Sequence, residues 1–152
     1  MSVQTVPTNP PRILIVDDDP HTLEILSRWL AREGYATVRA ESGPACLDRL
    51  EQERIDVIVL DVMMPGMDGL QVCERLRANN EWRAIPVVLL TAKDDIETRS
   101  RGMSLGVSEY LTKPINKQEL LTRLRAQINS RQLARRLSET AEAIGGADAV
   151  KS

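Results

Sequence analysis

The most constraining feature of the sequence is a series of short apolar runs that alternate with segments of helical periodicity. Two of these runs, residues 57–60 and 86–90, are apolar at every position rather than at every second position. Such runs are typical of central strands in a parallel sheet, because helices cover both faces of those strands. Strands that alternate with helices also imply parallel βαβ units with right-handed crossovers. The sequence therefore predicts an α/β fold.

Five strands and five helices are expected along the chain. The strands are predicted at residues 12–16, 36–39, 56–60, 86–90 and 109–111. The helices are predicted at residues 20–33, from the N-cap Ser42 through Leu50, at 69–78, at 94–105, and from Lys117 to about Ile144. Ser42 is a favoured N-cap residue, and Gly34 and Gly106 stand where glycine commonly ends a helix.

The length and composition fit one domain. A chain of 152 residues is large enough for a single core. We expect this domain at residues 12–130, after a polar, proline-rich arm at residues 1–11. The sequence has no Phe, so its core must consist mainly of Leu, Ile and Val. Cys46 and Cys73 show no paired spacing and are expected to be reduced thiols packed in helices.

Charge and hydropathy argue against several classes of protein. A net charge of -2 gives no general attraction to nucleic acid or to an anionic membrane. No apolar run approaches the roughly 20 residues that span a bilayer, and residues 1–11 lack the apolar segment of a signal peptide. We therefore expect a cytoplasmic protein that binds neither membranes nor nucleic acid directly.

Polar residues stand at the ends of four predicted strands. They are Asp17 and Asp18 after the first strand, Asp61 after the third, Thr91 after the fourth and Lys113 after the fifth. The carboxyl ends of parallel strands meet at one edge of a sheet, where ligands bind in open α/β folds. Acids, a hydroxyl and an amine at that edge predict a site for a cation and a phosphate group.

The acidic residues suit magnesium. Mg²⁺ prefers oxygen ligands and usually binds one or two carboxylates together with waters and phosphate oxygens. Asp17, Asp18 and Asp61 offer such ligands, and no histidine or thiolate accompanies them to favour zinc. Carboxylates this close raise one another's pKa unless a cation is present. Asp19 directly precedes Pro20, so we interpret it as a helix cap.

Asp61 has the chemistry of a phosphoacceptor. A carboxylate can attack a phosphoryl group and form an acyl phosphate. This transfer depends on positioning and on neutralising charge at the phosphoryl oxygens. The ammonium of Lys113 and the hydroxyl of Thr91 are suited to those oxygens. His21, the only histidine, is expected to be a solvated side chain in the first turn of a helix.

Four stretches of the sequence carry a family resemblance. They are IVDDDP at residues 15–20, LDVMMPGMDG at 60–69, LTA at 90–92 and YLTKP at 110–114. Together, in this order, they resemble the receiver domain of bacterial two-component response regulators, the CheY-like family. The resemblance covers roughly residues 12–130. It implies a doubly wound, flavodoxin-like sheet of order 2-1-3-4-5 with five helices.

The resemblance also implies a role for each site residue. Asp61 would be the phosphoacceptor, with Thr91 and Lys113 in contact with the phosphoryl group. Asp17, Asp18, Asp61 and the backbone carbonyl of Met63 would hold Mg²⁺. Tyr110 would be the aromatic residue that moves inward when Thr91 is drawn to the phosphate, and the Lys113–Pro114 peptide would be cis.

The expected function is a phosphorylation switch rather than an enzyme that acts on other substrates. A histidine kinase or phosphotransfer protein would supply the phosphoryl group, and a downstream effector domain or protein would sense the change. The alternative is a haloacid-dehalogenase-type phosphohydrolase with Asp17 as nucleophile, since Asp17-Asp18-Asp19 satisfies its Asp-x-Asp pattern. The late acidic pair of such enzymes has no candidate after Lys113, and Asp61 would have no role.

The last helix is longer than a closing helix requires. Beyond its first turns a narrow apolar stripe, flanked by Arg131, Arg135 and Arg136, is formed by Leu133, Leu137, Ala141 and Ile144. Gly145-Gly146 is expected to end the helix, and the arginines are expected to be solvated. We interpret residues 131–152 as a helical extension or linker with a disordered end. It would either lead to an effector or pair with a second copy in a homodimer.

Overall fold

The computed structural model describes residues 9–92 and 94–151, and the environment of the side chains as far as residue 138. The strands are β1 (Arg12–Val16), β2 (Ala36–Ala40), β3 (Val57–Asp61), β4 (Val87–Thr91) and β5 (Glu109–Thr112). The helices are α1 (Pro20–Arg32), α2 (Gly43–Gln52), α3 (Gly69–Arg77), α4 (Ile96–Ser104) and α5 (Lys117–Lys151). Strands and helices alternate along the described chain, as predicted.

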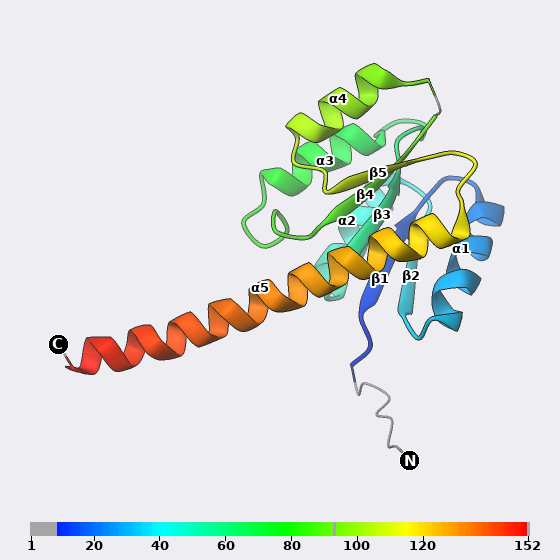
Figure 1. Cartoon of the computed structure of the whole chain (residues 1–152). Helices are drawn as coiled ribbons and strands as arrows, with labels where there is room; N and C mark the ends of the chain where they lie inside the picture. Colours follow the sequence, from blue (N-terminus) through cyan, green and yellow to red (C-terminus); the bar gives the residue numbers. More distant parts are fainter. Residues whose placement is uncertain (1–8, 93, 152) are drawn as a thin grey trace, which may run out of the picture.

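All neighbouring strands pair in parallel, and their order is β2-β1-β3-β4-β5 (Figure 1). The expected order and the doubly wound architecture are therefore confirmed. The order reverses between β1 and β3, which places the ends of these two strands side by side. Ligands bind at this reversal point in sheets of this kind.

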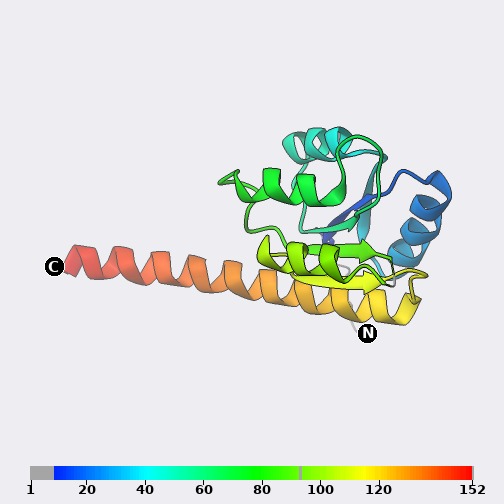
Figure 2. The same cartoon turned by 90° about the horizontal axis from the view of Figure 1, so that it is seen from above.

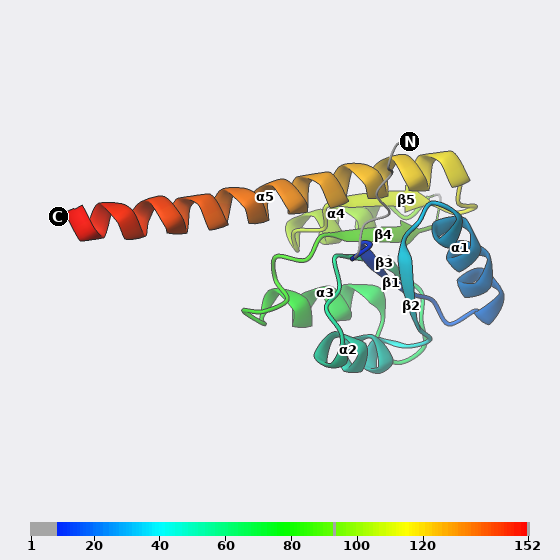
Figure 3. The same ribbon diagram turned by 90° about the horizontal axis from the view of Figure 1, so that it is seen from below.

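Helices cover both faces of the sheet (Figures 2 and 3). One core contains the inward residues of α1 and α5, such as Leu26 and Leu124, which pack on Ile13 and Ile15 of β1. The other contains α2 and α3 residues and packs on the opposite strand face. Every residue of β3 and β4 is buried, as their uninterrupted apolar runs predicted. Cys46 and Cys73 are free, buried thiols in the second core.

The two predicted helix caps, Asp19 and Ser42, are present, and Asp68 forms a third. Asp19 accepts a hydrogen bond from the backbone of His21, and Ser42 accepts one from Ala45. Asp68 caps α3 and exchanges hydrogen bonds with Gln71. Each cap satisfies a backbone N–H that the first turn of a helix leaves without a partner. These caps fix where the helices begin beside the ends of the strands.

The helix α5 has two parts with different surroundings. Its first turns pack on the sheet through Leu120, Leu121, Leu124 and Ile128. Beyond them the helix runs well past the sheet (Figure 1). Leu133 and Leu137 on this part are 55% and 61% exposed, whereas Ala141 and Ile144 lie outside the residues whose side chains are described. Pairing of two copies through this stripe stays a prediction.

The predicted end of α5 at Gly145-Gly146 is wrong, because the helix continues to Lys151. Glycine lowers helix propensity by only about 1 kcal/mol per residue and does not block the helical conformation. Among the described residues, no helix is both long and apolar enough to cross a membrane.

Candidate functional site

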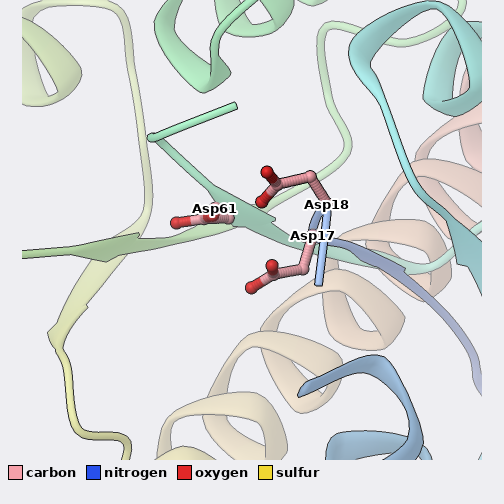
Figure 4. Close-up of side chains that lie close together, drawn as sticks. All are labelled: Asp17, Asp18 and Asp61. Atoms are coloured by element: carbon pink, nitrogen blue, oxygen red, sulfur yellow. The ribbon is translucent and has the colours of Figure 1, made fainter. Parts of the chain in front are cut away.

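Three carboxylates gather where β1 and β3 end (Figure 4). Asp17 follows β1, Asp61 is the last residue of β3, and one oxygen from each of Asp17, Asp18 and Asp61 lies within 4.8 Å of the others. Asp17 and Asp61 are buried, whereas Asp18 is exposed. The structure thus brings together the three acids that the sequence singled out.

The backbone fixes the two buried acids. The N–H of Asp17 donates to the carbonyl of Ala40 on β2, and its carboxylate accepts a hydrogen bond of 2.9 Å from the N–H of Asp19. Asp61 is paired in register with Leu90 of β4. Both carboxylates are therefore attached to central strands, which hold them in place more firmly than a loop would.

Lys113 reaches into this acidic cluster from the end of β5. Its Nζ atom lies 2.9 Å from Asp61 Oδ1 and 3.5 Å from Asp17 Oδ2. The backbone N–H of Lys113 donates to the carbonyl of Thr91, which ties this segment to β4. The Lys113–Pro114 peptide is cis, as expected. The ammonium is thus positioned on the carboxylate that the sequence identified as the phosphoacceptor.

Burial dominates the electrostatics of the cluster. It raises the pKa of Asp17 and of Asp61 above the ordinary range, although Lys113 and backbone hydrogen bonds act against this change. Burial alone would lower the pKa of Lys113, but its contact with Asp61 and the charge of Asp17 raise that pKa. The cluster therefore has more negative charge than Lys113 neutralises, and a divalent cation would relieve the repulsion.

Two buried oxygen atoms in the site have no hydrogen-bond partner within the described residues. They are Oγ1 of Thr91 and Oδ2 of Asp17, and Oδ2 of Asp17 has only its ion-pair contact of 3.5 Å with Lys113 Nζ. Buried polar atoms are normally hydrogen-bonded, so each such atom indicates that a ligand or water completes the site. A hard cation on the carboxylates and a phosphoryl oxygen near the hydroxyl would satisfy both. The donor set thus fits Mg²⁺ and a phosphoryl group.

The turn after β3 forms the remaining wall of the pocket around Asp61. Met63 is exposed, and its backbone hydrogen-bonds to the Asp61 carboxylate, which lowers the pKa of that carboxyl. A Cβ atom at Gly69 would lie 2.6 Å from the carbonyl oxygen of Asp61 and 2.8 Å from Cα of Val62. From the sequence, Gly69 was expected only as the first residue of a helix. A tight contact between distant parts of a turn has no local sequence signal.

Tyr110 lies on β5 with its side chain 38% exposed. The guanidinium of Arg99 on α4 lies 4.9 Å from the centre of its ring, and the same guanidinium donates to Thr112 Oγ1 at 3.0 Å. Arg99 thus holds the outward orientation of the tyrosine through a cation–π contact. The role of Arg99 could not be predicted from the sequence, because this contact joins a helix to a strand only in the folded chain.

Four further side chains have no part in the site. Asp19 caps α1, and the hydrogen bond from His21 lowers the pKa of its carboxyl. His21 is exposed, as expected. Trp29 and Trp82 are partly buried and pack against the two cores. None of these four side chains belongs to the acidic cluster.

A doubly wound sheet with an acidic pocket, a lysine and a hydroxyl at its carboxyl edge is the arrangement of a receiver class of signalling domain. Residues 13–125 match the response regulator receiver domain. The chain belongs to this family, which acts in two-component signalling. Family membership sets aside the phosphohydrolase alternative.

Similar proteins agree with this assignment. The chain is 44% identical over 117 residues to response regulator MprA of Mycolicibacterium vanbaalenii, an alignment that covers 77% of this chain and 50% of that protein. The chain spans about half the length of the curated relatives it matches. Chemotaxis protein CheY4 of Vibrio cholerae has 30% identity and a TM-score of 0.73, over 77% of this chain and 98% of that one.

A longer structural match is an adenylate cyclase structure from Rhodopirellula baltica. It has 29% sequence identity and a TM-score of 0.80, and the match covers 88% of this chain and 98% of that chain. Receiver-like structures thus occur in proteins with different names.

Proposed function

We propose that this domain is a phosphorylation switch in which Asp61 accepts a phosphoryl group from a histidine kinase or a phosphotransfer protein. The observation that carries the proposal is the pocket around Asp61. Its buried carboxylate has Lys113 Nζ at 2.9 Å, two further aspartates beside it and the partnerless hydroxyl of Thr91 nearby in the fold. This arrangement supports nucleophilic attack by Asp61 on phosphorus.

The transfer breaks the P–N bond of a phosphohistidine and forms a P–O bond to Asp61. The imidazole of the donor leaves and takes up a proton, and an acyl phosphate results. Lys113 neutralises charge on the phosphoryl oxygens, and the Thr91 hydroxyl donates to one of them. These groups catalyse only the domain's own phosphorylation and its later hydrolysis.

Magnesium would bind at the same cluster. Asp17 and Asp18 would hold it together with Asp61 and the carbonyl of Met63, and the ion would supply charge neutralisation to the phosphoryl oxygens. The raised pKa values of Asp17 and Asp61 support this role, because they show that burial disfavours the ionised carboxylates and that Lys113 does not fully offset it.

Phosphorylation would change the partner of Lys113 and thereby the surface of the domain. In the unmodified domain Lys113 contacts the Asp61 carboxylate itself. With a phosphoryl group present, Lys113 and Thr91 would move toward its oxygens, and Tyr110 would turn inward behind Thr91. A shift from 1:99 to 99:1 between two states requires about 5.5 kcal/mol, which a dianionic group with these contacts is suited to supply.

The organisation of the chain follows from this role. We propose residues 12–130 as the receiver domain, residues 1–11 as an arm and residues 131–152 as a helical connection toward an effector. The greater length of the curated relatives supports a further domain in the signalling pathway. A cytoplasmic location fits a domain that receives phosphoryl groups from kinases.

The substitution Asp61→Asn tests the central assignment. The amide keeps the shape of the carboxylate but is not a nucleophile, so labelling by acetyl phosphate in Mg²⁺ should disappear while the fold survives. Intact-protein mass spectrometry measures the added phosphoryl group, and circular dichroism checks the fold. Asp19→Asn is the matched control and should be labelled like the wild type. Full labelling of folded Asp61→Asn would remove Asp61 as the acceptor.

A further inference from the structure

A second cleft lies at the amino edge of the sheet, opposite the acidic pocket. It has a volume of about 780 Å³ and lies between α5 and the segments that lead into β4 and β5. Its walls include Ile85 and Pro86 before β4, Gly106 before β5, and residues 127–138 of α5. Ligand pockets in proteins commonly have volumes of about 300–1,000 Å³. The proposed phosphorylation chemistry makes no use of this cleft.

The charge of the cleft is positive. Arg77, Arg83, Arg131 and Arg135 line it, and no acidic residue does so among those whose side chains the structure describes. Arg135 is paired with Asp56 at 2.9 Å, at the side of the cleft. Arg77 and Arg131 are instead held by neutral acceptors, which orient their guanidiniums without cancelling the charge.

Backbone carbonyls fix two of these arginines in place. Arg77 donates to the carbonyls of Leu105 and Gly106, each at 2.7 Å, and to that of Arg83. Arg131 donates from Nη1 to the carbonyl of Ala84 at 2.9 Å. Guanidiniums that are already oriented lose little further freedom when a ligand binds, which favours recognition of an anion.

Two features indicate that these arginines have a role besides holding α5 against the domain. The Nε atom of Arg131 is buried and has no hydrogen-bond partner. The side chain of Arg83 is exposed at the cleft, and the structure gives it no hydrogen bond or ion pair within the described residues. Burial lowers the pKa of Arg131, and the charge of Arg135 lowers it further. An anion in the cleft would compensate this repulsion.

We propose that this arginine cleft binds a small molecule that carries a diphosphate or triphosphate group. Guanidiniums bind phosphate oxygens in a bidentate manner, and several of them in one concave site suit several linked phosphates better than one. The buried Ile85 and Pro86 provide an apolar wall beside the charges. The bound molecule would contact the α5 segment at residues 127–138, where the helix leaves the sheet.

Isothermal titration of the whole chain tests the proposal. The probes are inorganic pyrophosphate, ADP and orthophosphate, in EDTA so that the acidic pocket holds no metal. Pyrophosphate and ADP should bind one per chain and at least about tenfold more tightly than orthophosphate. Equal affinities for pyrophosphate and ADP identify the diphosphate group as the ligand. A tighter ADP complex identifies a nucleotide.

Variants locate the binding. Arg83→Gln should weaken pyrophosphate at least about fivefold, and Arg131→Gln about tenfold. Arg28→Gln is the matched control, because its side chain pairs with Glu24 on α1, away from the cleft, and its affinity should be that of the wild type. Arg83→Gln removes no described contact of the fold, so its result does not depend on the docking of α5.

Three outcomes would overturn the proposal. The first is no saturable binding of pyrophosphate at millimolar concentration. The second is unchanged affinity in Arg83→Gln and Arg131→Gln. The third is an equal loss in Arg28→Gln, which would show that the chain only attracts anions through its general charge. Thermal melting of each variant confirms that it is folded.

Discussion

The acidic pocket at the carboxyl edge of the sheet and the arginine cleft at the amino edge carry opposite charge. At the carboxyl edge, Asp17, Asp18 and Asp61 outnumber the single Lys113. At the amino edge, four arginines line one cleft, and no acid does within the described part of the chain. Helices of this fold begin near the first edge and end near the second, and their last turns carry basic residues, among them Arg32, Arg49, Arg77 and Arg101. The dipole of a helix favours negative charge near its N-terminus and positive charge near its C-terminus. The sign of the charge at each site therefore matches the helix ends that lie near it.

The edges differ in how their charges are held. The acids of the carboxyl edge lie at strand ends or directly after them, whereas the arginines of the amino edge come from α3, a loop and α5. A site on central strands keeps its geometry when loops change, whereas the second site depends on how α5 packs. The following predictions test this difference, from the largest expected effect to the smallest.

The largest effect is expected for Lys113→Ala at the carboxyl edge. The ammonium interacts with phosphoryl oxygens that exist only after modification, so its contribution differs between the two states. The variant should bind Mg²⁺ nearly as the wild type does but lose most of the conformational response to acetyl phosphate. Amide chemical-shift changes of α4 and β5 measure that response. Lys117→Ala is the matched control and should respond normally. A normal response of Lys113→Ala would exclude the residue from the switch.

Next in size is the loss of a metal ligand. Asp18→Ala should lower the affinity for Mg²⁺ by at least about tenfold, because a hard oxygen ligand is removed from a site with few of them. Asp19→Ala should leave this affinity unchanged and instead lower the free energy of unfolding by about 1 kcal/mol, as the loss of a helix cap does. Calorimetric titration and urea denaturation separate the two effects. An unchanged Mg²⁺ titration of Asp18→Ala would contradict the assigned ligand.

Asp17→Asn should stabilise the metal-free domain by about 1–2 kcal/mol at pH 7, the scale of a poorly compensated buried group. The pKa of Asp17 is raised in the folded chain, so the folded state binds more protons than the unfolded state. The ionised carboxylate destabilises the folded state to its full extent at pH values above the raised pKa. This destabilisation decreases as the pH falls toward 3.8, the ordinary pKa of the carboxyl group. Urea denaturation at several pH values should show the advantage of the variant shrink with acid. An advantage independent of pH would refute the electrostatic cause.

The smallest effect is expected at the amino edge. Arg135→Gln removes a partly exposed ion pair with Asp56, and such pairs contribute about 0.2–1 kcal/mol. The loss should concentrate in α5, so amides near residues 130–138 should exchange faster with solvent while those of β3 do not. Arg28→Gln, on the surface of α1, is the control. A large global loss of stability would show that the extended helix is part of the core.

The sequence predicted the carboxyl edge well because its signals are local. Each site residue stands at the end of an apolar run, and parallel strands bring such ends together without knowledge of side-chain packing. The strand boundaries shifted by only one residue, so that Asp61 and Thr91 end their strands rather than follow them. The caps at Asp19 and Ser42 could likewise be predicted, since their partners lie within three positions.

The contacts at the amino edge could not be predicted from residues that are neighbours in the sequence. Arg131, Arg135 and Arg136 were expected on a solvated face; Arg136 is exposed, whereas Arg131 and Arg135 are only partly exposed and contact the body of the domain. Arg131 binds the carbonyl of Ala84, 47 positions earlier, and Arg135 binds Asp56, 79 positions earlier. Contacts of this range depend on the exact path of α5 over the sheet. The contact of Arg99 with Tyr110 escaped prediction for the same reason.

Gly69 sets a limit on how the phosphoacceptor pocket can vary. Any side chain there would collide with backbone atoms of residues 61 and 62, which cannot move aside as a flexible side chain would. Engineering of the phosphoryl lifetime should therefore leave position 69 untouched. Exposed Met63 is the better position to randomise, because it borders the pocket without supporting its backbone. A variant library of this turn should return many residues at 63 and glycine alone at 69.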